Sequence, residues 1–346
     1  MQSLFRLTAH ILIPLTAVLC NAAYGATLVV ANKAEATASL IDLPSGEVVA
    51  TLPTDAGPHE VGISRDGRFA LVTNYGNREN VGRTITLIDI PAAEVVKTIE
   101  LGEHTKPHGV EWLDQERAVV TAEDSKALLV VNVTSGEIVS TIDTDQEITH
   151  MVAVDARRQR AYTANIGSGS ITVLDLEQGA RERNVMTGDG AEGVAVTASG
   201  KHIWVTNRAA DTVTVLDAGT FEKLMEMPSR GFPIRATATP KDQVLVTRAS
   251  AGDLVIYDAE TFAEIRTVSF DLEAMDVEER LFGDRFGDSS VPIGVIVDSA
   301  GERAFVAHAN ADVITEVDLA TGEIVRSLRA GREPDGMGYS EQTVEH

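Results

Sequence analysis

Three histidines occupy equivalent places in successive repeated segments of this chain: His59, His108 and His150. Two of them directly follow a proline, Pro58 and Pro107. Imidazole nitrogens bind zinc, copper, nickel and iron, and a site with three protein ligands keeps one coordination position open for chemistry. The three histidines are therefore a candidate metal site, and a divalent transition metal such as zinc or copper is the cofactor that they would suit.

In the other repeats, the same position holds different residue types: Glu192, Ile234, Ile293 and Asp335. Imidazoles close to carboxylates can also provide a general base and a general acid. A structural alternative stands beside both interpretations. A residue that recurs with the repeat can bond the backbone of its neighbour and line an opening without binding any ligand.

The repeat is visible as a four-residue run at 29–32, 71–74, 204–207 and 305–308. An aspartate usually follows the end of the run by ten residues, as in Asn32 to Asp42. A repeat period of roughly 42 residues indicates a propeller or a solenoid. The repeat thus sets the fold class before any single segment is considered.

Within one unit the apolar residues alternate, which is the period of a half-buried strand. In the second unit we predict strands at 59–64, 68–74, 84–90 and 94–101, with a tight turn at 64–67. Four antiparallel strands in a unit of about 40 residues are typical of a propeller blade.

First and second strands each occur seven times, but the two series are offset along the chain. The chain enters the repeat with a second strand near Thr27 and ends with an unpartnered first strand at 334–340. These two segments are expected to pair, because an open ring would leave two unpaired edges. The predicted fold is all-β: one seven-bladed β-propeller domain of four-stranded antiparallel blades over 26–346, closed by its C-terminal strand on the N-terminal blade.

Equivalent positions in a closed ring converge on its axis, so distant residues are expected to meet at one mouth. Arg235, beside the axis position of its blade, is a candidate anion anchor or a partner for an acidic residue of the insertion at about 269–290. His308 ends a second strand and is expected on the same face. The predicted ligand-binding set is His59, His108, His150, Glu192, Arg235, His308 and Asp335.

Two segments are longer than the repeat requires, at 75–83 and at about 269–290. The alternating strand directions place both on the face that carries the mouth, where binding residues collect. The second segment is acidic and also contains Phe282 and Phe286. It is expected either to cover the channel as a lid or to leave the body as a surface excursion.

Residues 1–25 have the pattern of a secretory signal peptide: Arg6, an apolar stretch to Leu19, and then small residues. Cleavage is expected after Gly25 or Ala26, so the mature chain would be periplasmic or secreted, without cysteine and without a transmembrane segment. Acylation of Cys20 as a lipoprotein is the weaker alternative, because Leu19 is bulky where a small residue is needed.

The chain has 52 acidic and 29 basic residues, a formal net charge of −23. Such a surface repels nucleic acid phosphates unless one face has a basic patch, and none is visible in the sequence. Nucleic acid is therefore not expected as a partner. A small molecule, a metal ion or a periplasmic protein is expected instead, bound by a monomer.

The runs at 71–74 and 204–207, followed by 84–89 and 212–217, resemble the YVTN-repeat β-propellers, as do the Pro-His-x-Val openings at 58–61 and 107–110. The resemblance implies an exported seven-bladed propeller, because such relatives include cell-surface proteins, a periplasmic protein that binds single-stranded DNA, and propellers of quinoprotein oxidation systems. Ala122 and Arg248 depart from it where the motif has Asn, as does the acidic insertion.

Three functions follow for the mouth. The leading hypothesis is an exported scaffold, without turnover of its own, that binds a small ligand, a metal ion or a protein partner. The second is a metal-assisted enzyme of the hydrolase, lactonase or lyase kind that uses the same histidines. The third is a purely structural adaptor between proteins. The fold alone does not decide among them.

Overall fold

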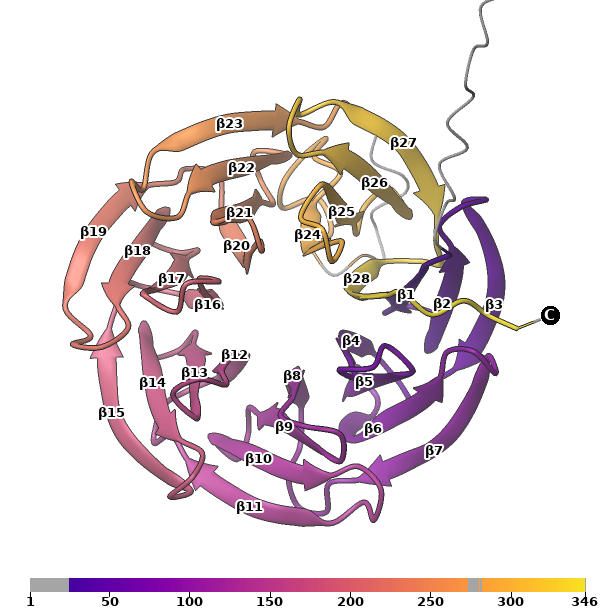
Figure 1. The fold of residues 1–346 in the computed structure, drawn as a ribbon, viewed down its shortest axis with the longest axis horizontal. Helices are drawn as coiled ribbons and strands as arrows, with labels where there is room; N and C mark the ends of the chain where they lie inside the picture. The colour runs from indigo at the N-terminus through magenta and orange to yellow at the C-terminus, as the bar shows by residue number, and fades with distance from the viewer. Residues whose placement is uncertain (1–24, 273–279, 281, 346) are drawn as a thin grey trace, which may run out of the picture.

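The computed structural model describes residues 25–272, 280 and 282–345, and its strands form one closed ring of blades (Figure 1). Cys20 and the predicted signal peptide, apart from Gly25, lie outside the described residues, as do 273–279 and 281 of the acidic insertion. The described residues form 28 strands and no helix, in seven four-stranded antiparallel sheets. The all-β, seven-bladed prediction is confirmed.

Each blade begins with a strand at the axis and continues outward. The first strands are β4 (Pro58–Ile63), β8 (Pro107–Trp112), β12 (Thr149–Asp155), β16 (Ala191–Val196), β20 (Pro233–Ala238), β24 (Pro292–Val297) and β28 (Pro334–Ser340). The second strands are β1 (Thr27–Asn32), β5 (Phe69–Gly76), β9 (Arg117–Ala122), β13 (Arg160–Asn165), β17 (His202–Asn207), β21 (Gln243–Arg248) and β25 (Arg303–His308).

The two outer strands complete each sheet. The third strands are β2 (Thr37–Asp42), β6 (Val81–Asp89), β10 (Ala127–Asn132), β14 (Ser170–Asp175), β18 (Thr212–Asp217), β22 (Asp253–Asp258) and β26 (Val313–Asp318). The fourth strands are β3 (Glu47–Pro53), β7 (Glu94–Glu100), β11 (Ile138–Asp143), β15 (Ala180–Met186), β19 (Lys223–Pro228), β23 (Glu264–Ser269) and β27 (Ile324–Arg329).

The ring closes as predicted, between the two ends of the chain. β28 pairs antiparallel with β1, with Thr27 opposite Ser340 and Val30 opposite Met337. The Thr27 hydroxyl adds a 2.8 Å hydrogen bond to the carbonyl of Gln342. The first blade therefore takes three strands from the start of the chain and one from its end, which leaves no unpaired edge at the closure.

One predicted loop is wrong. The segment 75–83 is mostly strand, because β5 continues to Gly76 and β6 begins at Val81, and these two residues pair. Only the tip at 77–80 is a turn, closed by a 2.8 Å backbone hydrogen bond from Asn77 to Asn80. The extra residues therefore lengthen a hairpin and hold Tyr75 in a regular strand.

The motif residues hold the blades together through hydrogen bonds. Asn74 donates to the hydroxyls of Thr84 and Thr86 on its third strand, at 2.9 and 3.0 Å. Thr73 accepts the backbone N–H of Glu60 in its own blade at 3.0 Å and donates to the His108 carbonyl of the next blade at 2.8 Å. The threonine of the motif thus fixes the backbone of the axis residue in the neighbouring blade.

The first strands approach each other closely around the axis. Glycine follows the axis residue in four blades, and a Cβ on Gly294 would lie only 2.1 Å from the carbonyl oxygen of Asp335. At the same position two other blades carry Glu60 and Arg235, whose long side chains occupy the centre of the channel. No described helix is long and apolar enough to cross a bilayer.

Candidate metal and ligand site at the channel mouth

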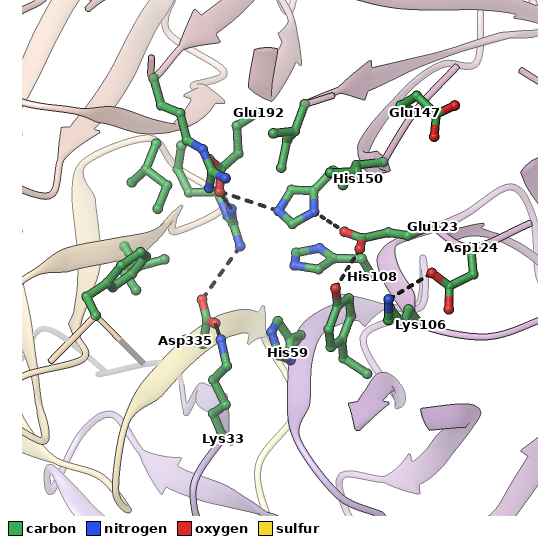
Figure 2. Close-up of a pocket in the computed structure, with 18 of the residues that line it drawn as sticks. Lys33, His59, Lys106, His108, Glu123, Asp124, Glu147, His150, Glu192 and Asp335 are labelled. Atoms are coloured by element: carbon green, nitrogen blue, oxygen red, sulfur yellow. Dashed lines mark hydrogen bonds and ion pairs between the residues drawn. The ribbon is translucent and has the colours of Figure 1, made fainter. Parts of the chain in front are cut away.

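A cavity of about 460 Å³ opens at the mouth of the channel (Figure 2). All seven axis positions contribute to its wall, one from each blade: His59, His108, His150, Glu192, Ile234, Ile293 and Asp335. The structure therefore brings together the residues that the repeat aligned. Their role as ligands stays a prediction.

The rings of the three predicted histidines contact one another, His108 with His150 at a tilt and His59 edge-on to His108. The ring centroids of His108 and His150 are 3.5 Å apart, and those of His59 and His108 are 4.9 Å apart. The Nδ1–H of His59 donates to the carbonyl of Gly57 at 2.8 Å, which leaves its Nε2 as the acceptor nitrogen. Burial lowers the pKa of His59 to about 3, so this ring is neutral at pH 7.

His108 is the histidine with an unused nitrogen. Its Nδ1 is buried and has no hydrogen-bond partner among the described residues. Burial, together with the charges of His150 and of nearby basic residues, lowers the pKa of His108 well below its ordinary value. A neutral imidazole with a free nitrogen is a ready ligand for a metal ion.

His150 lies between two carboxylates. Its Nδ1 is in short contact with Glu123, and its Nε2 lies 3.4 Å from Oε1 of Glu192. Burial would lower the pKa of His150, but the hydrogen bonds and charges of the two carboxylates outweigh it and raise the pKa. Against burial, His150, Arg208 and Arg235 hold the pKa of Glu192 below its ordinary range. The imidazole of His150 therefore keeps its proton to a higher pH than a free imidazole does.

A second ring of residues surrounds the histidines, and the sequence analysis missed it. In each blade one residue directly follows the motif's last residue, and five of these seven line the cavity: Lys33, Tyr75, Glu123, Ile166 and Arg208. The Tyr75 hydroxyl donates to Oε2 of Glu123 at 2.5 Å. Arg208 pairs with Glu192 at 2.6 Å. The signal was present in the repeat, one position beyond the motif's last residue.

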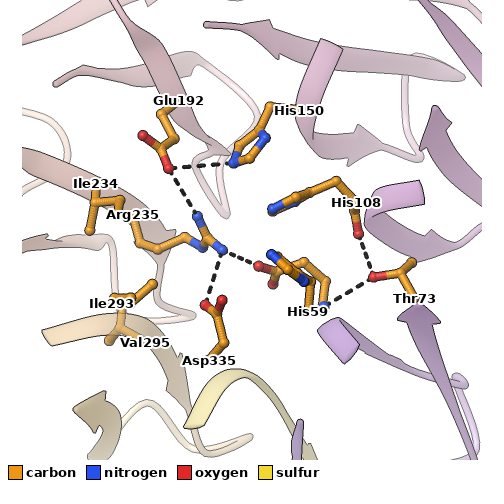
Figure 3. A network of polar contacts seen from close by, with 12 residues as sticks. His59, Thr73, His108, His150, Glu192, Ile234, Arg235, Ile293, Val295 and Asp335 are labelled. Carbon is orange, nitrogen blue, oxygen red and sulfur yellow. Dashed lines mark hydrogen bonds and ion pairs between the residues drawn. The ribbon is translucent and has the colours of Figure 1, made fainter. Parts of the chain in front are cut away.

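An ionic cluster closes the cavity below the histidines (Figure 3). Arg235 is buried against three carboxylates: in close contact with Glu60, 3.6 Å from Asp335 and 3.8 Å from Glu192. Lys33 adds a 3.1 Å ion pair to Asp335. Burial raises the pKa of Glu60 to about 7 despite Arg235. The guanidinium that we predicted as an anion anchor is thus already neutralised by the chain's own carboxylates.

His308 does not reach the mouth, which corrects the prediction for this residue. It is fully buried inside its blade, with Nδ1 2.9 Å from the Ser290 hydroxyl and Nε2 2.9 Å from the Thr315 hydroxyl. Its ring packs edge-on against Phe270. The physical reason is that His308 takes the place of the motif's Asn and bonds the third strand in the same way.

The most compact metal-binding group differs from the predicted one by a single member. His108, Glu123 and His150 are all buried, and each offers a ligand atom within 4.8 Å of the other two. Glu123 replaces His59 in this group. Two nitrogens and one carboxylate oxygen suit zinc and other divalent transition metals.

The described part of the acidic insertion packs at the mouth. Phe282 lines the cavity. The ring of Phe286 lies 5.1 Å from that of Phe282 and 5.0 Å from that of Phe232, measured between centroids. The three rings belong to an apolar cluster with the axis residues Ile234 and Ile293. The insertion therefore forms part of the wall on the side of the cavity where the axis residues are apolar.

Two family models match this sequence. The model of the YNCE-like beta-propeller matches residues 20–118, and the model of the Cytochrome D1 heme domain matches residues 112–280. No curated protein matches the chain. The two matches, the repeat motif and the seven observed blades agree on the architecture.

Proposed function

We propose that this chain, a YVTN-type seven-bladed propeller, is an exported binding protein that holds a divalent transition metal ion at its mouth. The observation behind the proposal is the buried group of His108, Glu123 and His150, whose ligand atoms lie within 4.8 Å of one another. Three protein ligands leave a coordination position open, and the 460 Å³ cavity above them has room for a small ligand.

Each residue has a distinct part in holding the ion. His108 is neutral and supplies a nitrogen that has no other partner among the described residues. His150 supplies Nδ1 once its proton has left, and Glu123 supplies the oxygen that now faces that nitrogen. Tyr75 and Glu192 stay outside the group and orient Glu123 and His150, as partners of metal ligands do.

A haem does not fit this mouth, although one of the matching families is named for its haem domain. Haem iron takes an axial side chain, and the polarity of the pocket walls sets its chemistry. Here the imidazole rings fill the space against one another, with centroids 3.5 and 4.9 Å apart, and more than half of the lining residues are charged or histidine. The proposal is therefore for a metal ion coordinated by side chains alone.

A second function, metal-assisted hydrolysis or elimination, is favoured by one specific arrangement. Tyr75, Glu123, His150 and Glu192 form a continuous chain of contacts next to the open cavity. Such a chain can hold and pass a proton during acid–base catalysis. Hydrolysis of lactone or ester substrates by the metal-loaded protein, lost in Glu123→Gln, would support this function over binding alone.

Metal analysis tests the leading proposal. Untagged protein is expected to bind about one zinc or copper ion per chain, and His108→Ala/His150→Ala to bind none. His104→Ala is a matched control, because His104 contacts Ser125 outside the cavity. Wild-type protein that takes up no divalent transition metal, or a double variant that keeps it, would refute the metal site.

Mass spectrometry of the exported protein tests export, with a mature N-terminus expected at Ala26 or Thr27.

A further inference from the structure

A second cavity lies in the same channel, below the ionic cluster. It measures about 400 Å³, and we call it the lower cavity. Arg235 lines both cavities, and the other residues of the lower cavity come from positions further along the first strands. A strand advances by about 3.3 Å per residue, so Trp112 lies well below His108 on β8. All seven blades contribute to the lower cavity.

Most of the residues that line the lower cavity are apolar. Valine occurs at the equivalent position of five blades, and larger apolar side chains complete the wall: Trp112, Met151, Ile296, Met337 and Tyr339. Gly62, Gly294 and Gly336 also line it, and at Gly336 a Cβ would lie 2.3 Å from the His59 carbonyl oxygen of the neighbouring first strand. A concave apolar site of this size with a few polar groups is typical of a small-molecule binding site.

Four charged residues line the lower cavity, and among the described residues only Glu111 is both partly buried and without an ion pair. Arg235 and Glu60 neutralise each other, and Arg65 lies exposed on the opposite face. Glu111 has no ion pair among the described residues. Its Oε2 accepts one 3.1 Å hydrogen bond from the backbone N–H of Val154. Burial raises the pKa of the Glu111 carboxyl to about 7, against the effect of that hydrogen bond.

The repeat shows that Glu111 is an exception. The equivalent residue is small in four blades, Gly62, Ala153, Ala195 and Gly338, as the strand registers define it. A carboxyl at this position therefore is not required by the blade. A buried carboxylate without a cation is costly, and a bound cation would recover that cost.

We infer that the lower cavity binds a small organic ammonium ion, with its charged group at Glu111 and its apolar body between the first strands. An anionic ligand is disfavoured by Glu111, and a neutral one would leave the Glu111 carboxylate without a counter-ion. The site is separate from the proposed metal group, because the ionic cluster lies between them.

The test uses benzylammonium as probe, with benzyl alcohol and benzoate as its neutral and anionic counterparts. Titration calorimetry on the full mature chain is expected to detect benzylammonium and not benzoate. Glu111→Gln keeps the size of the side chain and the oxygen that faces Val154, and it should weaken binding about tenfold or more. Glu116→Gln, an exposed change in the same blade, should have no effect.

Fluorescence locates the probe, because the chain has two tryptophans and only Trp112 lines the lower cavity. The emission change on binding should disappear in Trp112→Phe and persist when a metal chelator empties the mouth. Equal binding by Glu111→Gln and wild type, or equal binding of benzoate, would overturn the inference. No saturable binding of benzylammonium would overturn it as well. If Glu111→Gln unfolds at a much lower temperature than wild type, the inference is tested on wild-type protein instead, by comparing its affinities for benzylammonium, benzyl alcohol and benzoate.

Discussion

The two ends of the channel are built from the same seven strands, yet they differ in chemistry. The mouth, of about 460 Å³, is lined mostly by charged residues and histidines. The lower cavity, of about 400 Å³, is lined mostly by apolar residues. Most of the mouth residues lie at strand ends or in the loops next to them, where side chains of different types from neighbouring blades meet. Further along the first strand, valine occupies the equivalent position in five of the seven blades and packs between blades.

The two ends of the channel differ in how freely their side chains can change. Residues at strand ends can change without disturbing the packing between blades, so chemistry collects there. Glu60, Glu111 and Arg235 break this rule because they are charged and lie inside the strands. Glu60 and Arg235 divide the channel, and Glu111 introduces a charge into its apolar half. These three residues are therefore the first to substitute.

The largest loss of stability is expected when the Arg235 guanidinium between the two cavities is removed. Arg235→Ala leaves Glu60, Glu192 and Asp335 in the channel without their shared cation, and should lower the free energy of unfolding by about 3–5 kcal/mol. Urea unfolding measures it. Arg160→Ala, which removes the pair with Glu182 whose side chains are 23% and 24% exposed, is the control and should cost less than about 1 kcal/mol. Equal losses for the two variants would mean that the cluster does not stabilise the channel.

The second-largest effect is expected on zinc affinity, which should depend on His108 and not on His59. Loss of a residue that only orients a metal ligand reduces metal affinity 10- to 100-fold, so loss of a ligand should cost about 100-fold or more. His108→Ala is expected to lose that much zinc affinity in a competition titration. His59→Ala should stay within a few-fold of wild type, because His59 lies outside the compact group. The reverse order would restore the three-histidine site predicted from the repeat.

Metal affinity at the mouth should also depend on pH. The raised pKa of His150 means that its imidazole keeps its proton to a higher pH than a free imidazole does, and that proton must leave before Nδ1 can bind an ion. Zinc affinity should therefore fall as the pH is lowered, by about tenfold per unit below that pKa. Competition titrations across a pH series measure the slope.

Glu192→Gln is the control for that titration. It removes one of the two carboxylates that raise the pKa of His150, but no member of the metal group. The decline in affinity should then begin at lower pH than in wild type. A zinc affinity that is constant from pH 8 to pH 5, or an unchanged profile in Glu192→Gln, would exclude His150 as a ligand.

The sequence was sufficient for the architecture because the repeat reports backbone positions. Seven first strands, the offset of the second strands and the pairing of 334–340 with the segment at Thr27 all follow from spacing. The meeting of His59, His108 and His150 followed from the same symmetry. Strand ends were less certain: the extra residues at 75–83 lengthen a hairpin, because Gly76 and Val81 can pair.

The site was predicted less completely because contacts depend on how far side chains reach. Glu123 extends from the end of β9 to His150 in the next blade, and spacing says nothing about that reach. His308 was misplaced for a related reason. Its equivalence to the motif's Asn was visible, and the hydroxyl of Thr315, seven residues later, matches the partner that Ser39 provides for Asn32.

The departures from the motif can be understood in the same way. Ala122 replaces the Asn in the one blade whose third strand has Ala127 and Leu129 at the two partner positions, so no hydroxyl is left unpaired. Arg248 faces Asp253 in an ion pair. The Asn and its partners therefore change together, and this could have been predicted from the sequence alone.

The smallest effect is expected at the rim of the mouth, where ion pairs line the cavity but remain in contact with water. Lys126 and Glu147 are paired at 2.6 Å, with side chains 41% and 64% exposed. Solvent screens such a pair, so Lys126→Ala should lower the free energy of unfolding by less than about 1 kcal/mol and leave zinc affinity unchanged. Urea unfolding and the zinc competition titration check both outcomes. A loss similar to that of Arg235→Ala would show that charges at the mouth and charges inside the channel are equivalent, which is the reverse of the contrast drawn between the two ends.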